Sequence, residues 1–103
     1  MIARVWRGAV APTDGDAYAE YMQETGVPGY AKVPGNQGVW MLRRDLEGKT
    51  EFVMFTLWES MEAIEIFAGS HPETAVFYPE DDRFLVERET VVSHFEVIAH
   101  LTP

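Results

Sequence analysis

Residues 51–58 constrain the fold most, because this predicted strand is apolar on both of its faces. Successive side chains of a strand point to opposite sides of the sheet. One side carries Phe52, Met54, Thr56 and Trp58, and the other side carries Val53, Phe55 and Leu57. A sheet face in water is polar at alternate positions. Helices of the same chain can cover one face of this strand, so the other face also needs a cover.

The strand predicted at residues 39–44 has the same property, with Val39 and Met41 on one side and Trp40 and Leu42 on the other. An exposed apolar sheet face of this size is a liability in a monomer. We therefore expect a homodimer through the open sheet face, because two-fold pairing is the commonest arrangement of oligomers. The alternative is that the C-terminal segment folds back over this face.

The predicted elements follow the order strand, helix, strand, strand, helix, strand. Hydrophobic alternation and turn residues predict strands at residues 2–9, 39–44, 51–58 and 91–101, and a short strand or extended arm at 84–89. Helical spacing predicts one helix after the turn at 12–16 and another after Ser60. Gly26 and Pro28 predict the end of the first helix, followed by irregular structure at 27–38. The order is that of a ferredoxin-like βαββαβ fold of the α+β class, with a four-stranded antiparallel sheet.

Composition excludes several classes of function. A chain of 103 residues has the size of one domain, which we place at 1–103. Its net charge of −9 argues against nucleic acid and against a membrane surface as partners, since both attract an excess of Lys and Arg. The absence of cysteine excludes a disulfide, a catalytic thiol and a thiolate metal site. The N-terminus is too interrupted by charge for a signal peptide, so we expect a cytoplasmic location.

Two histidines are candidate catalytic residues. His71 stands between Ser70 and Pro72 at a predicted helix start, where a neutral imidazole can act as a base near neutral pH. The alternative is a capping or surface histidine. His94 and Glu96 share one face of the last strand, as an acid–base pair or as two metal ligands. Two ligands are too few for a metal site, so the alternative for His94 is a cross-strand hydrogen bond or an interface contact.

A second group of candidates is aromatic or acidic. Four aromatic residues can line a pocket for a planar substrate, although aromatic residues on strands also serve as core or interface. They are Trp6, Trp58, Phe67 and Tyr78. The acidic run Glu80-Asp81-Asp82 can bind a divalent cation through oxygen ligands. Its alternative role is to cap a turn and to pair with Arg83 or with a partner subunit.

Several stretches of the chain resemble a known family. The stretch LWESMEA at residues 57–63 and the stretch HFEV at 94–97 resemble the antibiotic biosynthesis monooxygenase-like domains. Further similarity lies in IARVWRG at 2–8, ETGVPGY at 24–30, PGNQG at 34–38 and YPEDDRF at 78–84. The resemblance implies a dimeric α+β barrel, in which two sheets face each other. It also implies a pocket in each protomer between the sheet and the helices.

Two chemistries of the wider family can be compared with these residues. The haem-degrading members rely on a first-strand Asn, a Trp in the second helix and a later His. The corresponding positions hold Trp6 or Arg7, Phe67 and Phe77, so haem degradation is not expected unless His71 substitutes from a shifted register. The cofactor-free members oxidise a phenolic or anthrone carbon. That reaction requires a group that helps to form the substrate anion, and an aromatic pocket that excludes water.

The resemblance therefore implies a cofactor-free monooxygenase-like enzyme that acts on a small hydrophobic or aromatic metabolite. No metal, flavin or other cofactor is expected. His71 is the expected base with His94 as a second candidate, and Trp6, Trp58, Phe67 and Tyr78 are the expected substrate-binding residues. One alternative is a non-catalytic ligand-binding or stress-response module of the same fold. Another is a structural dimer with a collapsed pocket.

Overall fold

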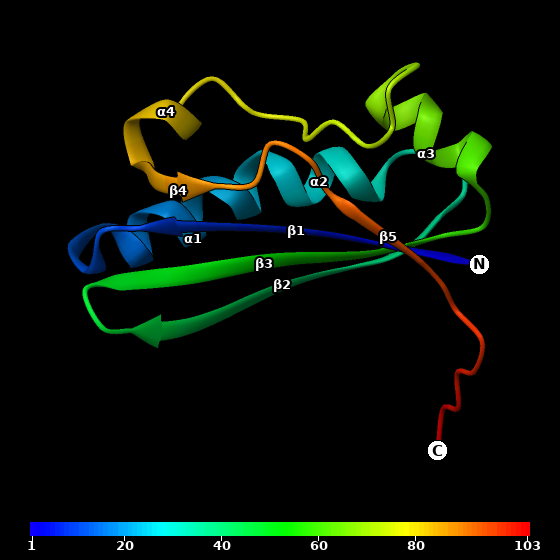
Figure 1. Cartoon of the computed structure of the whole chain (residues 1–103), viewed down its shortest axis with the longest axis horizontal. Coiled ribbons are helices and arrows are strands. Elements are labelled where there is room, and N and C mark those ends of the chain that lie inside the picture. Colours follow the sequence, from blue (N-terminus) through cyan, green and yellow to red (C-terminus); the bar gives the residue numbers. More distant parts are fainter.

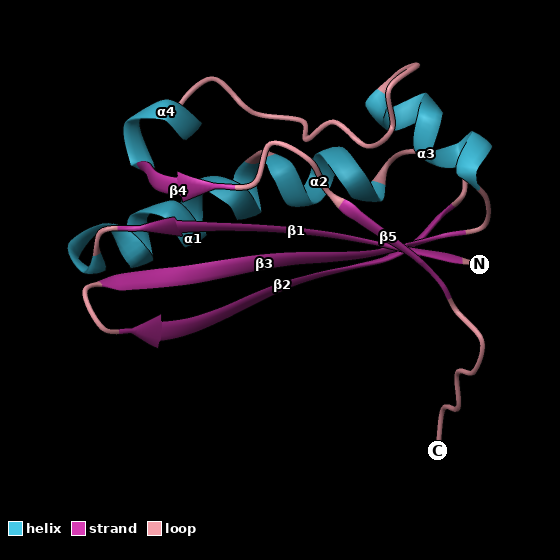
Figure 2. Cartoon of the chain, in the orientation of Figure 1, coloured by secondary structure: helices cyan, strands magenta, loops and turns pink.

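A computed structural model describes residues 1–103 and contains one antiparallel sheet covered by helices on one face (Figures 1 and 2). The strand order is β2-β3-β1-β4, and β5 also pairs with β1. The strands are β1 (Ile2–Val10), β2 (Asn36–Leu46), β3 (Lys49–Trp58), β4 (Leu85–Arg88) and β5 (Ser93–Glu96). This confirms the α+β, ferredoxin-like class predicted from the sequence.

The long strand β1 lies at the centre of the sheet and carries three partners. On one edge β3 pairs along its whole length, from Ile2 opposite Trp58 to Val10 opposite Thr50. On the other edge, β5 pairs with the first half of β1 and β4 with the second half. The gap between these two short strands is bridged by Trp6, whose Nε1 donates to the Glu89 carbonyl oxygen at 2.8 Å. The short C-terminal strands thus share one edge.

The helices lie together on one side of the sheet, with α3 near one end and α4 near the other (Figure 1). They are the 3₁₀ turn η1 (Pro12–Asp14), α1 (Gly15–Glu24), α2 (Gly26–Ala31), α3 (Met61–Ala68) and α4 (Asp81–Phe84). The Ser60 hydroxyl begins α3 by accepting the Ala63 backbone N–H, as a capping side chain does. Gly69 ends α3 at a φ of +84°, a conformation that favours glycine. No helix is both long enough and apolar enough to cross a membrane.

Both faces of β3 are apolar, as predicted, but helices cover only one face of the sheet (Figure 1). The helix-facing side chains Phe52, Met54 and Trp58 are almost fully buried. They pack into one core with side chains from the helices: Tyr18, Met22, Tyr30, Ala63 and Ile64. The opposite face, which we call the open face, leaves Trp40 at 46%, Leu42 at 48% and Phe95 at 56% exposure. No helix covers this face, and its exposed side chains lie on β2 and β5, while Leu57 of β3 on the same face is only 8% exposed.

Two predictions about element boundaries are wrong. Residues 26–31 form α2 instead of irregular structure, and α2 starts directly after Thr25. Pro28 is compatible with this helix because it lies in the first turn, where a missing N–H breaks no intrahelical bond. The last strand is restricted to Ser93–Glu96 instead of 91–101, and the residues after it have no regular structure. The side chains of Ile98 and Leu101 are 91% and 87% exposed, so this tail does not fold back over the open face.

Candidate functional site

A charged side chain lies in the layer between the sheet and the helices. Arg4 projects from the helix-facing side of β1 and is only 1% exposed. Its Nη2 donates to the backbone oxygens of Thr74 at 3.1 Å and Pro72 at 3.5 Å, and its Nε has no hydrogen-bond partner. No Asp or Glu oxygen lies within 4.0 Å of the guanidinium. A buried cation without a counter-ion is costly, and burial lowers the pKa of Arg4.

Aromatic rings surround this guanidinium. The Phe67 ring of α3 lies 5.4 Å from the Arg4 guanidinium carbon, within the range of a cation–π contact. Tyr30 of α2 stacks on Phe67 with ring centroids 4.5 Å apart, and Trp58 of β3 lies 5.7 Å from Phe67. We call Arg4, Tyr30, Trp58, Phe67 and the neighbouring Tyr78 the Arg4 cluster. It brings strand, helix and loop residues together in the core.

The two phenols of the Arg4 cluster are kept neutral. Burial raises the pKa of Tyr30, and the charge of Arg4 opposes that rise. Burial likewise raises the pKa of Tyr78 to about 12. The Tyr78 hydroxyl packs closely against α2 at Gly29, where an added Cβ would lie 2.6 Å from the Tyr78 Oη. Gly29 is therefore the residue that lets Tyr78 approach α2.

The acidic run 80–82 fixes the loop that carries Tyr78. Asp81 accepts the Tyr78 N–H at 2.6 Å and the Tyr18 hydroxyl at 3.1 Å. Burial raises the pKa of Asp81 despite these bonds. Glu80 pairs with Arg83, and Asp82 pairs with Arg88. Each carboxylate thus has a partner within the chain, as the turn-capping interpretation of the run predicts.

The two candidate bases occupy different environments. His94 of β5 lies opposite Arg4 in the β1–β5 register, and its Nε2 is buried without a partner. Burial and then the charge of Arg4 lower the pKa of His94, which keeps its imidazole neutral. The His71 side chain is 79% exposed and lies 3.8 Å from a Glu73 oxygen. The structure therefore brings His94 towards the Arg4 cluster but leaves His71 on the surface. Glu96, next on the same face of β5, makes no hydrogen bond to His94 and is exposed.

Three of the four predicted substrate-binding residues lie in the Arg4 cluster, and the fourth lies outside it. Trp58 packs on Phe67, and Tyr78 lies near Tyr30 and Arg4. Trp6 instead packs edge-on against Phe77, with ring centroids 6.2 Å apart. Sequence reasoning missed Arg4 and Tyr30. The signal for Arg4 was its position between Ile2 and Trp6 on one face of a predicted strand.

The Arg4 cluster is closed in this structure. The surface hollows lie elsewhere, and Arg43 borders both of them. One hollow of about 370 Å³ runs between α1 and β2, beside Met41 and Phe52. The other, of about 290 Å³, is on the sheet between Leu42 and Val53. Access to the Arg4 cluster therefore requires a movement of the segments that cover it.

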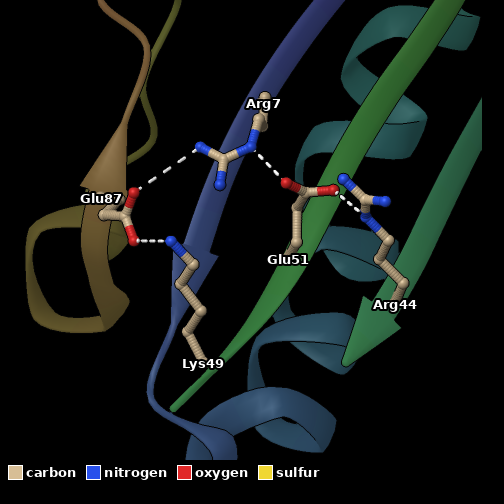
Figure 3. A network of polar contacts seen from close by, with 5 residues as sticks. All are labelled: Arg7, Arg44, Lys49, Glu51 and Glu87. Atoms are coloured by element: carbon tan, nitrogen blue, oxygen red, sulfur yellow. Dashed lines mark hydrogen bonds and ion pairs between the residues drawn. The ribbon is translucent and has the colours of Figure 1, made fainter. Parts of the chain in front are cut away.

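The open face also carries charges at the end near the β2–β3 turn (Figure 3). Glu51 binds Arg7 on β1 and Arg44 on β2, and these arginines cover it so that its side chain is 4% exposed. The two arginines lower the pKa of Glu51 through their hydrogen bonds. Glu87 of β4 binds Lys49 and lies 3.8 Å from Arg7. This charge network links four strands on the uncovered side.

Comparison with known proteins assigns the family. The sequence model of the antibiotic biosynthesis monooxygenases matches residues 1–76. The chain belongs to this family. No protein of curated function matches the sequence significantly. The match covers β1, α1, α2, the β2–β3 hairpin and α3. The Arg4 cluster of this antibiotic biosynthesis monooxygenase-family chain therefore lies within the matched residues, except for Tyr78.

Solved structures share the fold of this family member at low sequence identity. A Bacillus cereus protein named for the same family has a TM-score of 0.69 and 17% identity, over 99% of this chain and 97% of that one. The haem-degrader MhuD from Mycobacterium tuberculosis, with two haems in its active site, has a TM-score of 0.63 and 18% identity, over 99% of this chain and all of that one. An MhuD variant with two manganese protoporphyrins has the same TM-score at 19% identity, and each chain is covered fully.

Proposed function

We propose that the chain is a cofactor-independent, monooxygenase-like enzyme that acts on a small hydrophobic or aromatic metabolite between the sheet and the helices. The observation that carries this proposal is the Arg4 cluster, a set of aromatic rings around a buried guanidinium in a member of the antibiotic biosynthesis monooxygenase family. Flat rings such as Phe67, Trp58 and Tyr30 favour a planar ligand and exclude water from it.

The proposed reaction converts a phenolic or anthrone carbon to a quinone carbonyl. A base removes a proton from the substrate, and the resulting anion gives electrons to O₂. One oxygen atom enters the product and the other leaves as water. We assign the base role to His94 in preference to His71, because its buried, unpartnered Nε2 faces the same layer as Arg4.

Oxygen consumption tests this function. The purified protein is incubated with phenols and anthrones in an oxygen electrode, and the products are identified as quinones that carry one atom of the O₂ consumed. We expect uptake with at least one anthrone. Uptake should be lost in His94→Gln and retained in His71→Ala, whose side chain is on the surface. Loss in His71→Ala with an unchanged melting temperature would return the base role to His71. If no substrate causes oxygen uptake, the proposed enzymatic function is wrong.

A non-catalytic ligand-binding module is the second candidate. The buried Nε–H of Arg4 without an acceptor favours it, because such a donor can hold an anionic ligand without any reacting group beside it. Tight binding of an anthrone without oxygen uptake would distinguish this function from the enzyme.

Haem degradation is not part of the proposal. The haem-bound MhuD structures share the fold only, at 18% and 19% identity. In this chain Phe67 stacks on Tyr30 and Phe77 packs on Trp6, and neither can ligate iron. We expect added haem with a reductant to keep its Soret absorbance, and a protein-dependent loss of that band would overturn this exclusion.

We further propose that the open face pairs with a second copy of the chain. The exposed Trp40, Leu42 and Phe95 support this pairing, because a solvated sheet face is polar at alternate positions. The C-terminal tail supplies no cover, since Ile98 and Leu101 extend into solvent. A specific dimer of this kind buries about 800 Å² per partner.

A further inference from the structure

We infer that the Nε–Nη2 edge of Arg4 binds the oxyanion of a planar aromatic ligand, after residues 71–75 move off the guanidinium. The inference deepens the proposed function by naming the substrate class, and it rests on that function for its biological meaning. Its physical basis is separate, because it concerns binding and not turnover.

The first step is the unmet bonding capacity of Arg4. The guanidinium is buried, no carboxylate neutralises it, and its Nε–H has no acceptor. The Tyr30 phenol lies nearby and favours the charged form of Arg4, but it is itself neutral. Arginine presents its N–H groups as a planar fork that matches a carboxylate or another oxyanion. Such a free N–H inside a core is rare, since almost all buried polar groups are paired. An anion at this edge would supply the missing charge and the missing acceptor together.

The second step is the identity of the present acceptors. The backbone oxygens of Pro72 and Thr74 belong to the loop between α3 and α4, which runs across the helical side of the molecule (Figure 1). They are neutral, and one of the two bonds is long at 3.5 Å. A charge-assisted bond is about twice as strong as a neutral one. An oxyanion therefore competes well against these two carbonyls.

The third step concerns the attachment of this loop. Besides Arg4, backbone bonds hold it to residues 90–92: Ala75 N–H to the Thr90 oxygen at 2.9 Å, and Val92 N–H to the Glu73 oxygen at 2.8 Å. The pairing of Thr74 with Val91 is an isolated bridge and not a ladder. Phe77 and Tyr78 are held separately, by Trp6 and by Asp81, so they stay in place. To uncover Arg4, only residues 71–75 must move, which breaks these two bonds and withdraws the buried Ala75. The rings of Phe67 and Tyr30 then offer a flat wall beside the anion.

Binding of matched probes tests the inference without any turnover. Calorimetry compares 2-naphthoate with 2-naphthamide, which share a ring system and differ in charge. We expect at least a tenfold tighter binding of the acid. The net charge of −9 repels anions from the protein as a whole, so such a preference must come from a local site. Equal affinities of the two probes would overturn the inference.

Variants then locate the preference. Arg4→Gln should abolish it and Arg4→Lys should reduce it, because lysine lacks the planar fork. Arg43→Gln is the matched control, since Arg43 pairs with Asp16 at the surface and should leave the preference unchanged. If Arg4→Gln fails to fold, the wild-type protein still gives an answer. Naphthoate should shift the NMR resonance of the Arg4 Nε–H, and an unmoved resonance would overturn the inference.

Phenolates and carboxylates are distinguished by a second probe. Bound 2-naphthol should show the absorption of its anion at a pH where free naphthol is neutral, if the site takes phenolates. Binding of naphthoate alone would restrict the class to carboxylates. Acid preference without oxygen uptake would remove the proposed enzyme but keep this site. Oxygen uptake without a preference for the acid would overturn the Arg4 site and support the proposed enzyme.

Discussion

Arg4 and His94 are neighbours across two strands, and the environment of each depends on the other. A positive charge beside a buried imidazole disfavours a second positive charge, so His94 stays neutral. The sequence does not reveal that these two residues form a pair, because residues 4 and 94 come together only through the β1–β5 register. His94 was predicted as a candidate because it shares one face of the last strand with Glu96, whereas Arg4 was missed because arginines on strands usually reach solvent.

The lowered pKa of His94 predicts a pH dependence of stability. The folded state holds this imidazole neutral below its ordinary pKa of 6.5, while the unfolded chain takes up a proton there. The contribution of His94 to the free energy of unfolding is therefore fully present above about pH 6.5. It is lost as the pH drops from there towards the pKa of His94 in the folded state. Glu73 opposes the shift and Arg4 supports it. Urea unfolding between pH 5.5 and 7.5 should show this slope, and His94→Gln should flatten it. An equal slope in the variant would assign the effect to other groups.

At the scale of elements, α2 and the loop after α3 decide the shape of the site. Period-two and helical patterns predicted β1, β2, β3 and α3, because each has a strongly apolar face. The helix α2 was missed because Gly26, Pro28 and Gly29 read as helix-breaking residues. Packing overrides that propensity: Tyr30 is almost fully buried, and Gly26 and Gly29 leave room for Met22 and Tyr78.

The close packing of α2 on the loop predicts a coupled pair of substitutions. Gly29→Ala places a methyl group 2.6 Å from the Tyr78 hydroxyl oxygen. We expect a destabilisation of about 1 kcal/mol from overpacking, partly offset by the better helix propensity of alanine. Adding Tyr78→Phe removes the clashing oxygen, so the double variant should be more stable than Gly29→Ala alone. Urea unfolding of the wild type, Gly29→Ala, Tyr78→Phe and the double variant measures the coupling between the two sites. If the two changes in the free energy of unfolding simply add, residues 29 and 78 are not in contact.

At the scale of the whole molecule, one apolar sheet face is left in solvent. The sequence predicted this face correctly, since the alternation of β2 and β3 assigns each side chain to a side. It could not predict the charge network at one end of the face. That network depends on which strand lies beside which: Arg7 and Arg44 meet at Glu51 only because β3 lies between β1 and β2.

Sedimentation of the chain at micromolar concentration should show a dimer. Leu42→Glu, which places a charge on the open face, should give a compact monomer with the same circular dichroism. Ile66→Glu is the matched control, because Ile66 is even more exposed, at 67%, but lies on α3. This control should remain dimeric. A wild-type monomer, or dissociation by both substitutions alike, would rule out pairing through the sheet.

The carbonyls of Pro72 and Thr74 give the molecule one more property. Because these carbonyls occupy Arg4, they compete with the proposed ligand for the same N–H groups. The measured dissociation constant is then the intrinsic one divided by the fraction of molecules in which the loop is displaced. Substitutions far from any ligand, at the few bonds that hold residues 73–75 to 90–92, would then tune affinity without touching the binding surface. Natural selection for weaker or stronger ligand binding can therefore act on the bonds between residues 73–75 and 90–92 alone.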